Sequence, residues 1–184
     1  MKRSALMAVL ALAVAGPVAA DDFNYTFVSA DYSFIDSDGL DGDGLGAGVS
    51  FAFHENWHGF VGASFTSFDF DIDGTTAQAG VGYNTPVSEA IDLIAQVSYL
   101  YADIDTPFGG DSETGYGAAV GFRAHASENL EINGSINYAD IGDSSDTGFG
   151  LGAIYDFTES FSAGVNASWA DDVTGYGVLA RFYF

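Results

Sequence analysis

The feature that most constrains this chain is a strict alternation of apolar residues with small or polar ones. Residues 44–53 show the alternation most clearly, because every second position there is apolar. Successive side chains of a β-strand point to opposite faces, whereas a helix would mix the two sets. The alternation therefore predicts a strand with one apolar face. Its apolar positions are Leu45, Ala47, Val49, Phe51 and Phe53, and between them lie Gly44, Gly46, Gly48, Ser50 and Ala52.

The same alternation recurs along the rest of the chain and predicts an all-β fold. None of the recurring apolar rows contains a charged residue. With two noisier segments the total is ten strands, an even number, as expected for a single-chain membrane barrel of bacterial type. The further clear rows are Thr75, Ala77, Ala79, Val81, Tyr83; Ile91, Leu93, Ala95, Val97, Tyr99, Tyr101; Tyr116, Ala118, Val120, Phe122, Ala124; Leu130, Ile132, Gly134, Ile136, Tyr138; Phe149, Leu151, Ala153, Tyr155, Phe157; Phe161, Ala163, Val165, Ala167, Trp169; and Tyr176, Val178, Ala180, Phe182, Phe184.

The two noisier segments are residues 23–35 and 57–69. In the second segment Phe60 and Phe68 interrupt the alternation. We expect the apolar face to carry Val28, Ala30, Tyr32 and Phe34 in the first and Val61, Ala63 and Phe65 in the second, with Ser29, Asp31 and Ser33 on the opposite face.

The residues between the apolar rows decide which face is outside. A soluble ligand-carrying barrel would have the same period with its faces reversed, and its outer face would carry Lys, Glu, Thr and Arg. Lys is absent after residue 2, and the second face is instead Gly, Ser, Ala, Asn and Gln. Such residues suit the lumen of a membrane barrel. The sequence therefore predicts a ten-stranded antiparallel up-and-down transmembrane β-barrel with its apolar rows against lipid.

The first twenty residues are expected to be removed. Lys2 and Arg3 precede an apolar stretch that ends in a small-residue cleavage site at residues 18–20, the pattern of a secretory signal peptide. A membrane anchor helix is the alternative, but the stretch is short for a span. Residues 21–184 then form one barrel domain with two basic residues against 26 acidic ones and no cysteine. This charge excludes nucleic acid as a partner, because nucleic-acid affinity comes mainly from neutralising phosphates.

The signal peptide, the ten alternating segments and the aromatic end of the chain resemble the small outer-membrane β-barrel superfamily. That group includes the outer membrane protein A transmembrane domain and its X-like and W-like relatives, of which the A- and X-like barrels have eight strands rather than ten. The resemblance implies a place in the bacterial outer membrane among lipid and lipopolysaccharide. It also implies that the insertion machinery reads the last apolar row as its signal. That row is Tyr176, Val178, Ala180, Phe182 and Phe184.

The predicted connections alternate between short turns and longer loops. Short turns are expected at residues 54–56, 85–90, 127–129 and 158–160, and the other connections centre on residues 36–43, 70–74, 103–113, 140–146 and 171–174. Such barrels place short turns and both termini in the periplasm and longer loops outside. Aromatic belts are expected at both interfaces. One belt is Phe53, Trp57, Tyr83, Phe157, Phe161, Phe182 and Phe184, and the other is Phe34, Phe65, Tyr101, Tyr116, Tyr138, Phe149, Trp169 and Tyr176.

The predicted outer loops carry 16 of the 26 acidic residues. Asp36, Asp38, Asp41 and Asp43 share one loop and are candidate ligands for Ca²⁺ or Mg²⁺, which prefer several carboxylate and carbonyl oxygens. The alternatives are a solvated acidic surface and cations held loosely between the loops and lipopolysaccharide phosphates. No other cofactor is expected.

A few charged residues are expected inside the barrel. A buried charge needs a partner, so a structural ion-pair network is the first interpretation, and a charged constriction that selects solutes is the alternative. We expect Asp92 and Glu131 to lie near Arg123, and Asp31 near Arg181 where the first strand closes on the last. The full set is Asp31, Asp92, Arg123, Glu131, Asp156 and Arg181.

Catalysis has little support in the sequence. His54, His58 and His125 are expected at the periplasmic rim, and the acidic loops contain no histidine. We therefore expect no enzyme. The two functional hypotheses are a structural or surface-interaction barrel with acidic outer loops and, alternatively, a narrow cation-preferring pore for small solutes.

Overall fold

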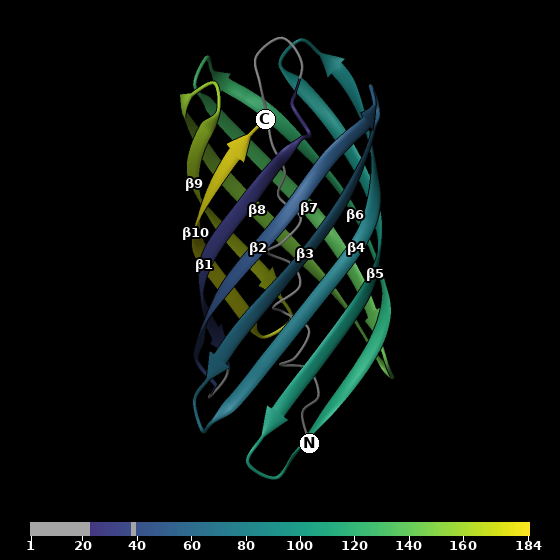
Figure 1. The fold of residues 1–184 in the computed structure, drawn as a ribbon, viewed down its shortest axis with the longest axis vertical. Coiled ribbons are helices and arrows are strands. Elements are labelled where there is room, and N and C mark those ends of the chain that lie inside the picture. Colours follow the sequence, from purple (N-terminus) through teal and green to yellow (C-terminus); the bar gives the residue numbers. More distant parts are fainter. Residues whose placement is uncertain (1–22, 38–39) are drawn as a thin grey trace.

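The chain forms a closed β-barrel in which each strand pairs antiparallel with its neighbours in sequence, and the first strand pairs with the last (Figure 1). The computed structural model describes residues 23–37 and 40–184, so the expected signal peptide lies outside the described residues. The ten strands confirm the predicted fold class. They are β1 (Phe27–Ser37), β2 (Gly42–His54), β3 (Trp57–Phe68), β4 (Ile72–Ser88), β5 (Ile91–Thr106), β6 (Gly109–Ser127), β7 (Leu130–Ile141), β8 (Ser144–Thr158), β9 (Phe161–Ala170) and β10 (Val173–Tyr183).

Closure of the sheet is made by β1 and β10. Their register runs from Phe27 opposite Tyr183 to Ser37 opposite Val173 without a bulge. Because no strand is left at an edge, the backbone N–H and C=O groups find partners within the sheet, as a hydrocarbon environment requires. In the part of the chain that the structure describes, no helix has the length and hydropathy needed to cross a bilayer.

The predicted apolar rows lie on the outside of the barrel. Leu45, Val97 and Tyr116 have 63%, 58% and 71% of their surface exposed, whereas soluble proteins bury most such side chains. The two noisier segments follow the same rule, since Val28 and Phe65 face outward. The interruptions at Phe60 and Phe68 are inward-facing aromatic residues, and Phe68 is buried with Ile35 and Val173.

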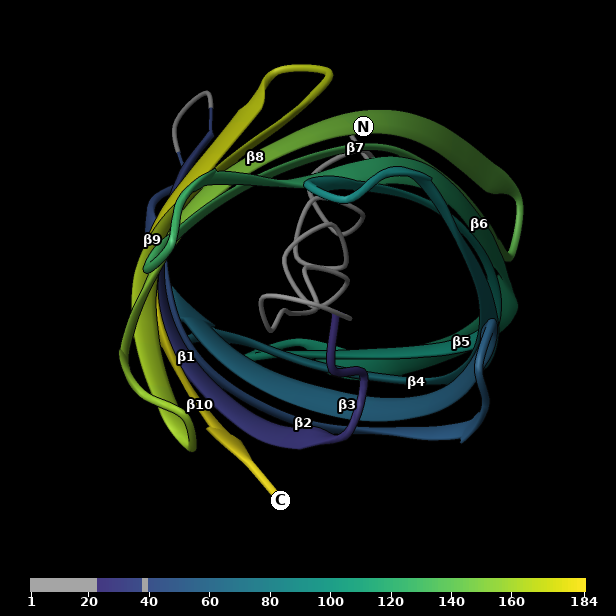
Figure 2. The ribbon, with the colours of Figure 1, turned by 90° about the horizontal axis from the view of Figure 1, so that it is seen from above.

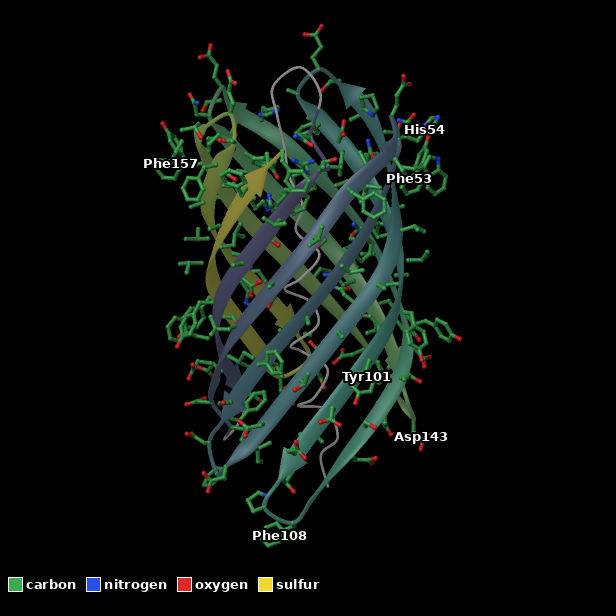
Figure 3. All side chains as sticks on the ribbon, in the orientation of Figure 1. Phe53, His54, Tyr101, Phe108, Asp143 and Phe157 are labelled. Carbon is green, nitrogen blue, oxygen red and sulfur yellow. The ribbon has the colours of Figure 1, made fainter. Side chains whose placement is uncertain are left out.

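The two ends of the barrel differ in composition (Figure 3). We call one the terminal end: it carries residue 23, Phe184 and the turns at residues 55–56, 89–90, 128–129 and 159–160. Phe53, His54 and Phe157 lie there in Figure 3. We call the other the acidic end: it carries the connections at residues 38–41, 69–71, 107–108, 142–143 and 171–172. All members of both predicted aromatic belts are exposed on the outer surface.

The prediction of longer loops at the acidic end of the barrel is wrong. The strands continue through most of the predicted loops, and β5 and β6 run on until only residues 107–108 connect them. Within this extension Asp103 pairs with Ser112 and Asp105 with Gly110. Both faces of such an extension can meet water, so the apolar alternation that reveals a strand inside the bilayer disappears while the backbone ladder continues.

A lysine placed on the lipid face tests the orientation of the barrel. Val97 lies near the middle of β5 on the exposed face, so Val97→Lys should lower the free energy of unfolding by about 2–4 kcal/mol, the cost of a charge at mid-bilayer depth. Phe108→Lys at the fully exposed tip of the β5–β6 hairpin is the matched control and should change it by about 0.5 kcal/mol or less. Denaturant unfolding in lipid vesicles measures both, and equal effects would contradict the assigned orientation.

Candidate functional site

The interior wall is built from polar residues that face glycines. Gly152 pairs with Asn133 in the β7–β8 ladder, and a Cβ added at Gly152 would lie 2.6 Å from Asn133 Oδ1. Because Gly152 has no side chain, the Asn133 side chain can extend along the wall over it. The same arrangement recurs at the opposed pairs Gly46–Asp31, Gly117–Ser98, Gly150–Ser135 and Gly177–Asn166.

A cavity lies against this wall on the β3–β8 side. It has a volume of about 40 Å³ and is lined by Phe60, Gln78, Gln96, Ser98 and Asn137, among others. Amide and hydroxyl groups dominate its polar lining. The middle of the interior thus offers hydrogen-bonding groups.

A buried ion pair occupies the interior at the terminal end. Arg123 on β6 donates from Nε and Nη2 to the two carboxylate oxygens of Glu131 on β7, at 3.1 and 2.8 Å. Asn133 donates a further hydrogen bond of 3.2 Å to Glu131. Arg123 and Glu131 are 1% and 0% exposed, so the bidentate geometry and the added amide offset the loss of water around both charges.

The segment before β1 meets this ion pair. The Tyr25 hydroxyl donates to Asp92 Oδ2 at 2.9 Å, and Asp92 lies opposite Arg123 in the β5–β6 ladder. Burial raises the pKa of Tyr25 above its ordinary value, so the hydroxyl keeps its proton and acts as the donor. Tyr25 precedes β1, and β5 is four strands away around the barrel, so the contact spans the interior.

Aromatic rings and the guanidinium form a chain of contacts at this level. His125 stacks on Phe23 with ring centroids 4.7 Å apart, and Tyr25 stacks on His58 at 4.5 Å. Between them Arg123 lies 4.5 Å from the Phe23 centroid and 4.9 Å from the Tyr25 centroid, within cation–π range. The chain of contacts links β6 to β3 through the segment that precedes β1.

Backbone and side-chain hydrogen bonds hold this segment in place. Ser50 Oγ donates to the carbonyl of Tyr25 at 2.8 Å, and the Ala52 N–H donates to Thr26 Oγ1 at 3.0 Å. The Thr26 N–H donates to Asn24 Oδ1 at 2.7 Å. In Figure 2 the purple start of the described chain runs from β1 toward the middle of the barrel. We call residues 23–26 the inward segment.

Phe23, Tyr25 and His58 are interior residues that were not among those predicted from the sequence. His58 is 2% exposed and contacts Gln96 and Asn84 through its ring nitrogens, at 3.1 and 3.4 Å, so the expected rim position is wrong for this histidine. The alternation of inward and outward side chains along each strand could have placed all three inside. In residues 57–69 the even positions face inward, and in the first segment the odd positions do.

The remaining predicted interior charges lie near the same end. Arg181 is 1% exposed and its guanidinium lies 5.3 Å from the Phe27 ring centroid. The register places Arg181 opposite Ser29, whereas the Asp31 carboxylate lies against the backbone of Gly46. The structure therefore gathers Asp92, Arg123 and Glu131 closely and leaves Asp31 farther along the wall.

Asp156 belongs to the neighbouring hairpin. It is half-buried on the inward face of β8, opposite Ser162 on β9. Its backbone N–H donates to the Asn129 carbonyl at 2.9 Å across the terminal-end turns. Asp156 therefore lies on the inward face at this end of the barrel, and its part in a charge network stays a prediction.

The candidate metal ligands are only partly described. Asp36 lies on β1, Asp43 on β2 and Asp41 in the connection, while Asp38 lies outside the described residues. Within residues 23–37 and 40–184, no group of three or more His, Cys, Asp or Glu side chains has the arrangement of a metal site. The metal site stays a prediction.

Three aspartates at the acidic end accept hydrogen bonds from tyrosines on the outer face of the barrel. These aspartates face outward, next to the belt. The pairs are Tyr32–Asp43 at 2.8 Å, Tyr101–Asp103 at 3.4 Å and Tyr138–Asp140 at 3.2 Å.

The predicted insertion row lies on the outer face of β10 and on the residue that follows it. Tyr176, Val178, Phe182 and Phe184 are 52%, 54%, 52% and 71% exposed, and Ala180 lies between them on the same face. The row is therefore available to lipid or to another protein. Its recognition by insertion machinery stays a prediction.

Comparison with known proteins agrees with this geometry. The family of the outer membrane protein beta-barrel domain matches residues 4–157. The chain belongs to this family. It is thus an integral outer-membrane β-barrel. No curated protein matches the sequence.

Solved structures share the fold at low sequence identity. A bacterial polysaccharide outer membrane secretin is 16% identical, with a TM-score of 0.52 over 89% of this chain and 67% of that one. The beta domain of the Bordetella autotransporter BrkA is 9% identical, with a TM-score of 0.51 over 88% of this chain and 100% of that one. The KdgM porin is 16% identical, with a TM-score of 0.48 over 85% and 99%.

Glu131→Gln tests the buried ion pair. The amide removes the carboxylate that accepts two hydrogen bonds from the buried Arg123 guanidinium, so the free energy of unfolding should fall by about 3–5 kcal/mol. Glu159→Gln in the exposed β8–β9 turn is the matched control and should change it by about 0.5 kcal/mol or less. Chemical unfolding in vesicles measures both.

The double variant Arg123→Met with Glu131→Leu separates charge imbalance from loss of packing. Removing both charges should restore most of the lost stability, because apolar residues of similar volume replace buried ion pairs at little cost. A double variant as unstable as Glu131→Gln would show that the ion pair is not what the single change disturbs.

Proposed function

We propose that the protein is a non-enzymatic outer-membrane barrel with a structural or surface-interaction role performed at its acidic end. The observation that carries this proposal is the buried cluster of Tyr25, Asp92, Arg123 and Glu131. These side chains occupy the interior at the terminal end, where a continuous pore would need space. The exposed acidic end is then the part of the molecule that meets other molecules.

The proposed orientation places the terminal end in the periplasm. Single-chain barrels of this type have both termini and tight turns on that side. Phe23 and Phe184 lie at the terminal end, together with four two-residue turns. The acidic end then faces the outer leaflet and its lipopolysaccharide.

The surface role is supported by outward-facing carboxylates beside the aromatic belt. Asp43, Asp103 and Asp140 each accept a tyrosine hydrogen bond at the depth where headgroups begin. Carboxylates repel lipopolysaccharide phosphates unless cations lie between them. We therefore propose loosely bound Ca²⁺ or Mg²⁺ between the acidic end and lipopolysaccharide.

The histidines support the non-enzymatic part of the proposal. His58 and His125 each stack on an aromatic ring at the terminal end, away from the acidic connections. These contacts are typical of histidines that pack in a protein interior, and they give neither histidine a catalytic partner among the acidic connections.

A narrow cation-preferring pore is the second candidate, and the interior wall favours it. Glycines let the opposed polar side chains lie along the wall, and Gln78, Gln96 and Asn137 line the cavity in the middle of the barrel. The inward acids Asp31, Asp92, Glu131 and Asp156 would favour cations.

Planar-bilayer recording separates the two candidates. Refolded residues 21–184 should give no discrete current steps, because the buried cluster obstructs the terminal end. An open porin added to the same bilayer is the control that inserted barrels are detected. Steady cation-selective steps from this protein alone would favour the pore.

A Ca²⁺ titration tests the role of the acidic end. The melting temperature of the wild type should rise with Ca²⁺, and a variant with Asp36, Asp38, Asp41 and Asp43 replaced by Asn should lose most of the rise. The matched control replaces the turn carboxylates of the opposite rim, Glu55, Glu89, Glu128 and Glu159, by Gln and should keep the rise. An equal response in all three proteins would rule out this group of aspartates.

A further inference from the structure

The inward segment contacts the far wall of the barrel. Phe23 and Tyr25 reach Arg123 and His125 on β6 and Asp92 on β5, whereas β1 itself pairs with β2 and β10. The segment therefore crosses the interior at the level of the buried ion pair. Figure 2 shows its path inward from the barrel wall.

The contacts of the inward segment are separable from those of the wall. Arg123 and Glu131 bond to each other through adjacent strands, and none of the three hydrogen bonds of Glu131 involves the segment. If the segment left, the ion pair would stay intact. The segment would give up the hydrogen bond to Asp92, the contacts of its two rings with Arg123 and the histidines, and two hydrogen bonds to β2.

The wall behind the segment does not need it for closure. All ten strands pair around the barrel, and β1 begins only at Phe27. Beyond the cluster, in the direction of the acidic end, lies the cavity lined by Gln96 and Ser98, among others. The inward segment thus lies in series with this cavity.

We propose that the inward segment is a plug, and that its displacement turns the closed barrel into a conduit for small hydrated cations. The proposal deepens the proposed function and rests on the closed state assigned there. Phe23 fills the space between Arg123 and His125 on β6, Tyr25 fills the space between Arg123 and His58 on β3, and the Tyr25–Asp92 hydrogen bond holds Tyr25 in place. With the rings withdrawn, Asp92 faces the passage beside the Arg123–Glu131 pair, whose charges offset each other, and Asp92 sets the preference for cations.

The plug is tested by removing its rings. In planar bilayers the double variant Phe23→Ala with Tyr25→Ala should show discrete cation-selective steps where the wild type shows none. Phe157→Ala is the matched control, because this ring lies at the same end but faces outward with 61% exposure, and it should stay silent. Far-UV circular dichroism checks that each variant keeps its β-barrel.

Two further variants make the result specific. Tyr25→Phe keeps the ring and loses only the hydroxyl that meets Asp92, so it should give brief openings even if the double variant does not fold. Ser98→Cys added to the double variant provides the single thiol of an otherwise cysteine-free chain, and a charged thiol reagent should then reduce the current.

The outcomes separate the plug from the proposed function. Steps of equal size in the wild type and the double variant would refute the closed state itself. Silence of the folded double variant and of Tyr25→Phe would overturn the plug while the closed state stands. Steps in Phe157→Ala, or a current that the thiol reagent leaves unchanged, would also overturn it, since the current would not depend on the rings or pass through the interior.

Discussion

The structure depends on one constraint: within hydrocarbon, every backbone N–H and C=O must find its partner in the protein. The chain meets it by pairing ten strands in a ring, so that β1 and β10 leave no edge. Closure then divides the side chains into two sets. Alternate residues face lipid, where Leu45 and Val97 are exposed without cost, and the others share one enclosed space.

That enclosed space imposes its own rule on charge. A guanidinium that cannot reach water needs a carboxylate on a neighbouring strand, and the register supplies one. Arg123 lies opposite Asp92 on one side and Asn133 on the other, with Glu131 two residues along β7. Glycine makes the polar wall possible, because a Cβ at Gly46 or Gly152 would collide with the inward side chain opposite it.

The sequence predicts those parts of the structure that follow from the alternation of side chains between the two faces of each strand. Once Val61 and Phe65 face lipid, the positions of the inward residues on that strand follow, His58 included. Apolar and polar residues alternate only where one face of a strand meets lipid and the other does not. The prediction therefore fails where the strands extend beyond the bilayer. At Asp103 and Asp105 both faces of the strand can meet water, and the sequence alone suggests a loop where the ladder continues.

Pairing partners across the barrel are harder to predict than faces. The sequence brings Arg123 near Asp92 and Glu131, because consecutive strands are neighbours. It cannot fix the register at which β1 meets β10, and that register puts Ser29, not Asp31, opposite Arg181. The path of the inward segment is equally hard to predict. Phe23 and Tyr25 occupy odd positions, as the inward residues of β1 do, but they lie outside its hydrogen-bonded ladder.

The division between wall and inward segment has a consequence for how such a barrel can change state. A ring of ten paired strands is stiff, because altering its diameter would break backbone hydrogen bonds along whole ladders. The inward segment is held by contacts that involve a few side chains and the first residues before β1. The state of the interior can therefore depend on local contacts at one end, while the wall that the membrane surrounds stays unchanged.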